Sequence, residues 1–295
     1  MSTRNAQSSA SAQGGRLVIC PTPLGNLGDM TQRALKAFSQ VDVVCCEDTR
    51  VTGKLLAALG IEKRLERLDE ATISHAADRI VERVLAGEVI GYASDAGMPG
   101  VSDPGQRLID AAHNAGAQVE VLPGPTAVAT AYVASGFTSQ NFYFGSFFPR
   151  KQGERERVLA PLVQLPAVLV FYESPQRIVS TLEFLAQALP MRRVAVCREL
   201  TKLHEEVVRG NVSEVLEVFR ERERTQGVKG EIALVIDAPS EEEETAQAED
   251  ARSDAAARAA EMLAEGALSK KDVVRALRDE FGISRNEAYE LVHGA

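Results

Sequence analysis

The sequence contains no tryptophan, and aromatic residues make up only 5% of its 295 residues. It has no apolar run near the roughly 20 residues that a membrane-spanning helix requires. Its first 14 residues are rich in serine, alanine and glutamine and lack the apolar stretch of a signal peptide. We therefore expect a soluble, cytoplasmic protein with few stacking platforms for nucleic-acid bases, and a disordered tail over residues 1–14.

The sequence also lacks the excess of basic residues that nucleic-acid-binding proteins usually carry. Its net charge is −9, and residues 240–295 hold 14 acidic but only seven basic residues. Any contact with RNA must therefore depend on a local basic patch. Arg150–Arg157 and Lys229 are candidates for such a patch, although the first segment could equally be the solvated start of a helix.

Cysteine is scarce, and the four cysteines show no metal-binding pattern. They are Cys20, Cys45, Cys46 and Cys197, and each lies within or at the end of an apolar run without C-x-x-C spacing. A redox or zinc site is the alternative, but reduced thiols in the core of a cytoplasmic protein fit this pattern better. No metal site is predicted.

Strand-like and helix-like segments alternate through residues 15–136. Strands are predicted over residues 16–20, 41–46, 89–93 and 118–122. The capping pattern at Asp29 predicts a helix over residues 30–40, and Thr52 can cap the next helix, which ends at Gly60. This alternation predicts an α/β domain whose parallel sheet carries helices on both faces.

Residues 137–239 depart from that alternation. Strands are predicted over residues 142–147, 167–172, 193–198, 205–209 and 231–237. The third and fourth of these strands follow one another without a helix, which favours a mixed, partly antiparallel sheet. We therefore predict a second α/β domain with a topology different from that of the first.

The C-terminal residues differ in character from both domains. Residues 240–250 are strongly acidic and are predicted to form a solvated linker. Residues 251–295 predict about three short helices, with Ser269 and Ser284 as caps and Gly282 as the turn between the last two. This spacing resembles a helix-turn-helix, but the low number of basic residues favours a docking appendage over DNA binding.

Loops rich in glycine and proline follow three predicted strands of the first domain. Pro21–Asp29 has neither a G-x-G-x-x-G fingerprint nor the Gly-Lys-Ser/Thr ending of a phosphate loop. Ser94–Gly105 and Pro123–Thr126 are the other two loops. Because ligands bind beyond the carboxyl ends of parallel strands, the loops together predict a cleft for an adenosine-bearing ligand. An ordinary turn is the alternative for the first loop taken alone.

Seven segments between residues 15 and 239 resemble the motifs of the tetrapyrrole methylase superfamily, in the same order. They are PTPLGNLGDMTQRAL, CCEDTR, SDAGMPGVSDPG, VLPGPTA, FYESPQR, RELTK and KGEIALVI. Within that superfamily, the chain is most similar to the bacterial enzymes that methylate a cytidine 2′-hydroxyl in 16S ribosomal RNA. The resemblance implies two α/β domains with a cofactor cleft between them, a small C-terminal helical appendage, S-adenosylmethionine as cofactor, and the small ribosomal subunit as partner. It also implies a homodimer, the commonest symmetric assembly.

The resemblance further implies which residues contact the cofactor. They are Pro23, Leu24, Asp95, Gly97, Met98, Pro125, Thr126, Tyr172, and the backbone near Glu231 and Ile232. Asp95 is expected to position the methionine portion of the cofactor, the alternative being an aspartate that only forms a turn.

Methyl transfer to a ribose oxygen needs alignment of the two reactants and removal of the hydroxyl proton. We expect Glu199 and Lys202 to act near the ribose, and the lysine could be a base if its pKa is lowered. Asp48 and Arg50 are expected to orient the ribose or its phosphate. Each of these residues could instead form a structural ion pair, and Glu173 is a further candidate for the base.

Two other functions stay open at this point. One is a sibling methylase that acts on a tetrapyrrole or on a protein side chain, and the other is a non-catalytic adaptor that binds S-adenosylmethionine. The EDTR, FYES and RELTK segments favour the ribosomal branch, and the polar clusters beside the predicted cleft favour catalysis.

Overall fold

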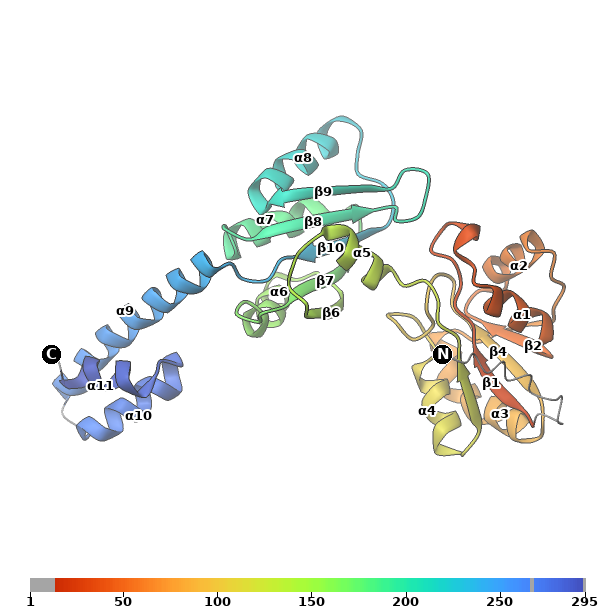
Figure 1. The fold of residues 1–295 in the computed structure, drawn as a ribbon, viewed down its shortest axis with the longest axis horizontal. Helices are drawn as coiled ribbons and strands as arrows, with labels where there is room; N and C mark the ends of the chain where they lie inside the picture. Colours follow the sequence, from red (N-terminus) through yellow and green to blue (C-terminus); the bar gives the residue numbers. More distant parts are fainter. Residues whose placement is uncertain (1–13, 266–267, 294–295) are drawn as a thin grey trace, which may run out of the picture.

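The computed structural model describes residues 14–265 and 268–293. Two sheet-containing domains lie side by side, and a long helix carries a small helical unit away from them (Figure 1). The tail predicted over residues 1–14 lies, except for Gly14, outside the described residues. Among the helices that the structure describes, none is both long enough and apolar enough to cross a membrane.

The first sheet has five parallel strands in the order β3-β2-β4-β1-β5. The strands are β1 (Arg16–Ile19), β2 (Val43–Cys46), β3 (Leu65–Arg67), β4 (Val89–Ala93) and β5 (Gln118–Val121). The predicted parallel sheet is confirmed. The prediction missed β3, because this edge strand has three residues, two of them charged, and therefore shows no apolar run.

Helices cover both faces of this sheet. They are α1 (Gln32–Gln40), α2 (Thr49–Ala58), α3 (Glu70–Leu85) and α4 (Gln106–Asn114). Alternate residues of β1 point to opposite faces. Leu17 and Ile19 join the core beneath α3 and α4, whereas Val18 and Cys20 join the core beneath α1 and α2.

Two of these helices begin at residues other than those predicted. Thr31 caps α1 by accepting a backbone N–H one turn further on, and Asp29 belongs instead to the short 3₁₀ helix Leu27–Asp29. Asp48 caps α2, and Thr52 lies buried within that helix. In each case several polar residues near the helix start could cap it, and the backbone conformation selects one.

The second sheet is mixed, as predicted, with strands in the order β6-β7-β10-β8-β9. Its strands are β6 (Phe142–Phe147), β7 (Val168–Glu173), β8 (Arg193–Arg198), β9 (Glu206–Asn211) and β10 (Ile232–Ile236). Strands β6 and β7 are parallel, and the other neighbouring pairs are antiparallel.

Helices also cover both faces of the second sheet. Three of them, α6 (Gln152–Leu159), α7 (Ile178–Ala188) and α8 (Val212–Thr225), pack on one face. The other face carries α5 (Ala127–Ser135), whose Val128 and Ala131 pack against it. The sequence placed this helix in the first domain, over residues 15–136. Because α5 packs on the second sheet, we place the division between the domains near residue 126.

The C-terminal helices are α9 (Glu241–Glu265), α10 (Lys270–Phe281) and α11 (Arg285–His293). The expected acidic linker over residues 240–250 is wrong, since its glutamates form the first turns of α9. Acidic residues are favourable at the positive end of a helix dipole. Ser269 and Ser284 cap the last two helices, as predicted, and the three helices share a core of their own.

Candidate active site between the two domains

The three glycine- and proline-rich loops meet beyond the first sheet. Thr22 and Gly97 exchange two backbone hydrogen bonds, of 2.9 and 3.1 Å, which join the first loop to the second. The third loop reaches the first at Gly124, where an added Cβ would lie 2.3 Å from the Cγ of Pro21. The sequence prediction that these loops lie together is therefore confirmed.

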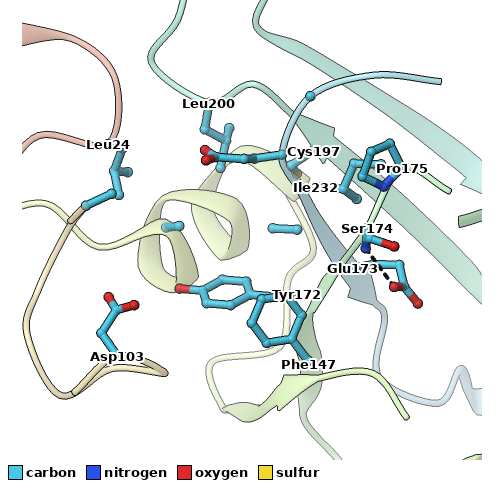
Figure 2. A pocket seen from close by; sticks show the side chains of 15 residues that line it. Leu24, Asp103, Phe147, Tyr172, Glu173, Ser174, Pro175, Cys197, Leu200 and Ile232 are labelled. Carbon is cyan, nitrogen blue, oxygen red and sulfur yellow. Dashed lines mark hydrogen bonds between the residues drawn. The ribbon is translucent and has the colours of Figure 1, made fainter. Parts of the chain in front are cut away.

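A cleft of about 340 Å³ lies between these loops and the second sheet. Its volume falls within the roughly 300–1,000 Å³ typical of small-molecule sites. Figure 2 shows Leu24 and Asp103 on one side, facing Tyr172, Phe147 and Ile232 on the other, with the tyrosine hydroxyl directed toward the first domain. The full lining is Leu24, Ala96, Asp103, Ala127, Phe147, Tyr172, Glu173, Ser174, Pro175, Cys197, Leu200, Gly230, Glu231, Ile232 and Ala233.

The predicted cofactor residues fall into two groups. Leu24, Tyr172, Glu231 and Ile232 line the cleft. The others lie within two residues of a lining residue and shape the loops: Pro23, Asp95, Gly97, Met98, Pro125 and Thr126. The cleft combines apolar walls with aromatic rings and a few polar groups, a lining that fits an adenosyl ligand.

Glu199, Lys202 and Glu231 form one ionic cluster beside the cleft. The ammonium of Lys202 lies 2.9 Å from a carboxylate oxygen of Glu199 and 2.9 Å from one of Glu231. The Glu231 backbone N–H donates to the Glu199 carboxylate at 2.8 Å, and its carbonyl accepts from the Glu199 N–H. The Glu231 backbone is therefore joined to Glu199 at the edge of the cleft that Glu231 lines.

The pKa values in this cluster reflect the pairing of Lys202 with two carboxylates. Burial lowers the pKa of Lys202, but hydrogen bonds to Glu231 and Glu199 outweigh it and raise that pKa above its ordinary value. Hydrogen bonds from the Glu231 backbone and from Lys202 lower the pKa of Glu199. These contacts favour a protonated Lys202, held as a positive charge between two carboxylates.

Lys202 also connects the two domains across the cleft. Its methylene chain lies against the first loop, where a Cβ on Gly25 would come within 2.5 Å of the Lys202 Cγ. The lysine belongs to the loop after β8 in the second domain. Glycine at position 25 therefore allows the first loop to approach this side chain closely.

Asp48 and Arg50 lie at the start of α2 and are not part of the cleft lining. The side chain and the backbone N–H of Arg50 donate hydrogen bonds to the Asp48 carboxylate, one of them from Nε at 3.0 Å. These hydrogen bonds hold the pKa of Asp48 well below its usual range. The Asp48 N–H donates to Asp95 at 3.2 Å. The Arg50 side chain is 86% exposed, so it remains accessible to an external phosphate.

Asp103 is a cleft residue that the sequence did not single out. Burial, followed by repulsion from Glu47 and Asp95, raises its pKa to about 7. Burial, followed by repulsion from Asp95, raises the pKa of Glu47. Burial, with repulsion from Asp48, raises the pKa of Asp95. Both Asp95 and Asp103 belong to the Ser94–Gly105 loop, so the loop was identified but not the aspartate that faces the cleft.

Glu173 lines the cleft but is occupied by its own neighbours. One carboxylate oxygen accepts the Ser174 N–H at 2.7 Å, as the dashed line in Figure 2 shows, and also pairs with Arg177. The other accepts the Thr181 hydroxyl at 2.6 Å. These bonds attach Glu173 to the start of α7 and leave it unsuited to the role of base.

Cys197 also lines the cleft, and its thiol is not a nucleophile. Burial raises the pKa of Cys197 to about 12, whereas the reactive form of cysteine is the thiolate. The cleft therefore supports direct transfer between two bound molecules rather than transfer through a covalent enzyme intermediate.

Comparison with known proteins identifies the family. The model of the Tetrapyrrole (Corrin/Porphyrin) Methylases matches residues 16–216. The chain belongs to this family. Methylases of this family use S-adenosylmethionine, so the chain is a methyltransferase with that cofactor, as the sequence predicted.

Individual relatives that share one name match nearly the whole length of this methylase. It is 36% identical to "Ribosomal RNA small subunit methyltransferase I" of Bacillus subtilis, over 95% of this chain and 94% of that protein. The corresponding Escherichia coli O157:H7 protein is 38% identical, over 96% of each. The Thermotoga maritima protein is 40% identical over 98% of its own length but only 75% of this chain.

Solved structures show the same fold. The methylase superimposes on a diphthine synthase with a TM-score of 0.59 and 16% identity, over 75% of this chain and 89% of that chain. A uroporphyrin-III-C-methyltransferase from Thermus thermophilus gives a TM-score of 0.53 and 22% identity, over 76% and 94% respectively. The two-domain α/β arrangement is thus that of the family.

Proposed function

We propose that this methylase transfers a methyl group from S-adenosylmethionine to the 2′-hydroxyl of a cytidine in 16S ribosomal RNA, within the small ribosomal subunit. The observation that carries the proposal is the match, over 95% of the chain, to a protein named for methylation of small-subunit ribosomal RNA. The nucleotide and the ribose position come from the resemblance of the CCEDTR, FYESPQR and RELTK segments.

The cleft residues supply binding and alignment. Leu24 and Ile232 offer apolar contacts from the two domains, and Tyr172 offers a ring and a hydroxyl. When bound, the cofactor provides an activated methyl group on a sulfonium. Alignment of two bound reactants can lower a barrier by roughly 7–11 kcal/mol, so we assign the three loops to holding the donor in a single pose. Pro23, Asp95, Gly97, Met98, Pro125 and Thr126 support that pose.

The charged clusters take different roles. Lys202, held by Glu199 and Glu231, fixes the first loop against the second domain. Arg50 lies outside the cleft lining with an exposed guanidinium, a group whose planar fork suits a phosphate. We therefore assign Arg50, oriented by Asp48, to the backbone of the RNA.

The direct test uses the methylase, labelled S-adenosylmethionine and small ribosomal subunits that lack the modification. We expect label in 16S RNA, recovered as 2′-O-methylcytidine after digestion to nucleosides. Transfer to a tetrapyrrole with none to ribosomal RNA would refute the proposal. Cofactor binding without transfer to any acceptor would instead support the adaptor.

We further propose that the methylase acts in the cytoplasm, where its ribosomal substrate is found, and as a homodimer. Two-fold symmetry is the commonest arrangement of soluble oligomers. Light scattering should then give twice the chain mass of 31.8 kDa, and the mass of a single chain at micromolar concentration would contradict the dimer.

A further inference from the structure

A basic pocket of about 290 Å³ lies in the second domain, at the end of β8. It is lined by Arg198, Arg222, Gln226, Gly227, Val228 and Lys229. These residues come from the last position of β8, the last turn of α8 and the segment that leads from α8 toward β10. Three of the six side chains carry a positive charge, and none of the described lining residues is acidic.

One carboxylate behind the pocket holds both of its guanidinium groups. The Arg198 Nε donates to an oxygen of Glu206 at 3.1 Å, and Arg222 donates to both oxygens of Glu206, at 2.7 and 2.5 Å. Hydrogen bonds from Arg222, against the effect of burial, and then from Arg198 lower the pKa of Glu206, so this carboxylate stays ionised. The Arg222 guanidinium also lies 5.1 Å from the centre of the Phe219 ring. Both guanidinium groups are therefore held in place before any ligand arrives.

The charges around the pocket do not cancel. Three cations share the single carboxylate of Glu206, which leaves an excess of two positive charges. The C-terminal end of α8 contributes roughly half a negative charge, which is too little to offset that excess. Its Arg222 carbonyl already accepts the N–H groups of Gln226 and Gly227, at 2.9 and 2.8 Å. The pocket therefore favours an anion.

The basic pocket and the cofactor cleft flank the same end of β8. Adjacent residues of a strand point to opposite faces of the sheet, and Cys197 lines the cleft whereas Arg198 lines the pocket. On the neighbouring segment Lys229 lines the pocket, and Gly230 and Glu231 line the cleft. Two residues of backbone span at most about 7 Å. The Arg198 guanidinium donates to the Lys229 carbonyl at 3.3 Å, so the two segments that separate the sites are joined.

We propose that this pocket binds a backbone phosphate of the ribosomal RNA, close to the nucleotide whose ribose enters the cofactor cleft. This inference rests on the proposed function. The planar guanidinium groups match phosphate oxygens through paired N–H donors, and the Lys229 ammonium adds a point charge. Because the six described lining residues include no aromatic side chain, the pocket suits a phosphate rather than a stacked base. Such a contact fixes the register of the RNA without reading its sequence.

The variant Lys229→Ala tests the pocket, with Lys36→Ala on the exposed side of α1 as the matched control. Lys229 is exposed, and its replacement leaves the backbone carbonyl that Arg198 binds in place. We expect Lys229→Ala to raise the KM for small subunits about fivefold and to reduce the salt dependence of binding by about one counterion. Lys229→Glu should raise the KM further, because a carboxylate repels the phosphate. The affinity for S-adenosylmethionine, measured by calorimetric titration, should stay at the wild-type value.

Equal KM values and equal salt slopes for Lys229→Ala and Lys36→Ala would overturn the assignment of the pocket. Weaker binding of S-adenosylmethionine by Lys229→Ala would also overturn it, since Lys229 would then act on the cofactor cleft through Gly230 and Glu231. These outcomes differ from a failure of the proposed function. If the wild type methylated no ribosomal RNA, that function would fail before any variant was compared, whereas normal methylation by both lysine variants would refute the pocket alone.

Discussion

Arg192 and Glu243 form a buried ion pair, in which the guanidinium Nε lies 3.0 Å from both carboxylate oxygens. The arginine is 1% exposed and the glutamate 6%. Arg192 also donates to the backbone carbonyls of Asp237 and Val163. Since Arg192 directly precedes β8 and Glu243 belongs to the first turn of α9, this pair attaches the long helix to the second domain.

The variant Glu243→Ala should destabilise the second domain. Removing one partner leaves the other charge buried and unpaired, which typically costs about 3–5 kcal/mol. Glu242→Ala is the matched control, because Glu242 is the preceding residue of the same helix and is exposed. Urea unfolding followed by circular dichroism measures the difference, and equal midpoints for the two variants would show that the pair does not attach α9.

The contact between Gly25 and Lys202 predicts a specific coupling. Gly25→Ala places a methyl group where the Lys202 side chain lies, so we expect it to displace the ammonium from Glu199 and Glu231 and to weaken cofactor binding about tenfold. In a Lys202→Ala background the same glycine substitution should cost much less, because the clash has gone. Calorimetric titration of the four proteins with S-adenosylmethionine gives the coupling energy, and additive effects would argue against the contact.

Arg50 should affect RNA binding more than cofactor binding. Its side chain is exposed and pairs with Asp48, so Arg50→Ala should weaken binding of small subunits about fivefold and reduce the salt dependence by about one counterion. Arg224→Ala is the matched control, since Arg224 is exposed and pairs with Glu221 on α8. Equal salt slopes for the two variants would place the phosphate contact elsewhere.

The sequence predicted the elements whose own residues carry the signal. Strands β4, β6 and β8 were predicted with the bounds that the structure shows, because clear apolar patterns mark them. The acidic start of α9 was not predicted to be helical. It is attached to the second domain by the ion pair between Arg192 and Glu243, which lie 51 residues apart in the sequence. No local pattern reports a partner at that distance.

The site was predicted to the level of loops but not of side chains. Asp95 and Asp103 share one loop, and its turns use positive φ values at Gly97, Gly100 and Gly105. Those backbone turns decide which carboxylate reaches the cleft, and sequence spacing does not encode them. Likewise, the pKa of Lys202 depends on the two carboxylates that surround it, one of which comes from a distant segment.

The four cysteines should be unreactive in the native methylase. All four are buried and unpaired with one another, and burial raises the pKa values of Cys20, Cys45 and Cys197 to about 12. A raised thiol pKa means that less of the reactive thiolate is present at a given pH. An aromatic disulfide reagent should therefore modify the folded protein slowly and all four thiols after denaturation. Rapid native modification abolished by Cys197→Ala would show instead that the cofactor cleft opens to the reagent.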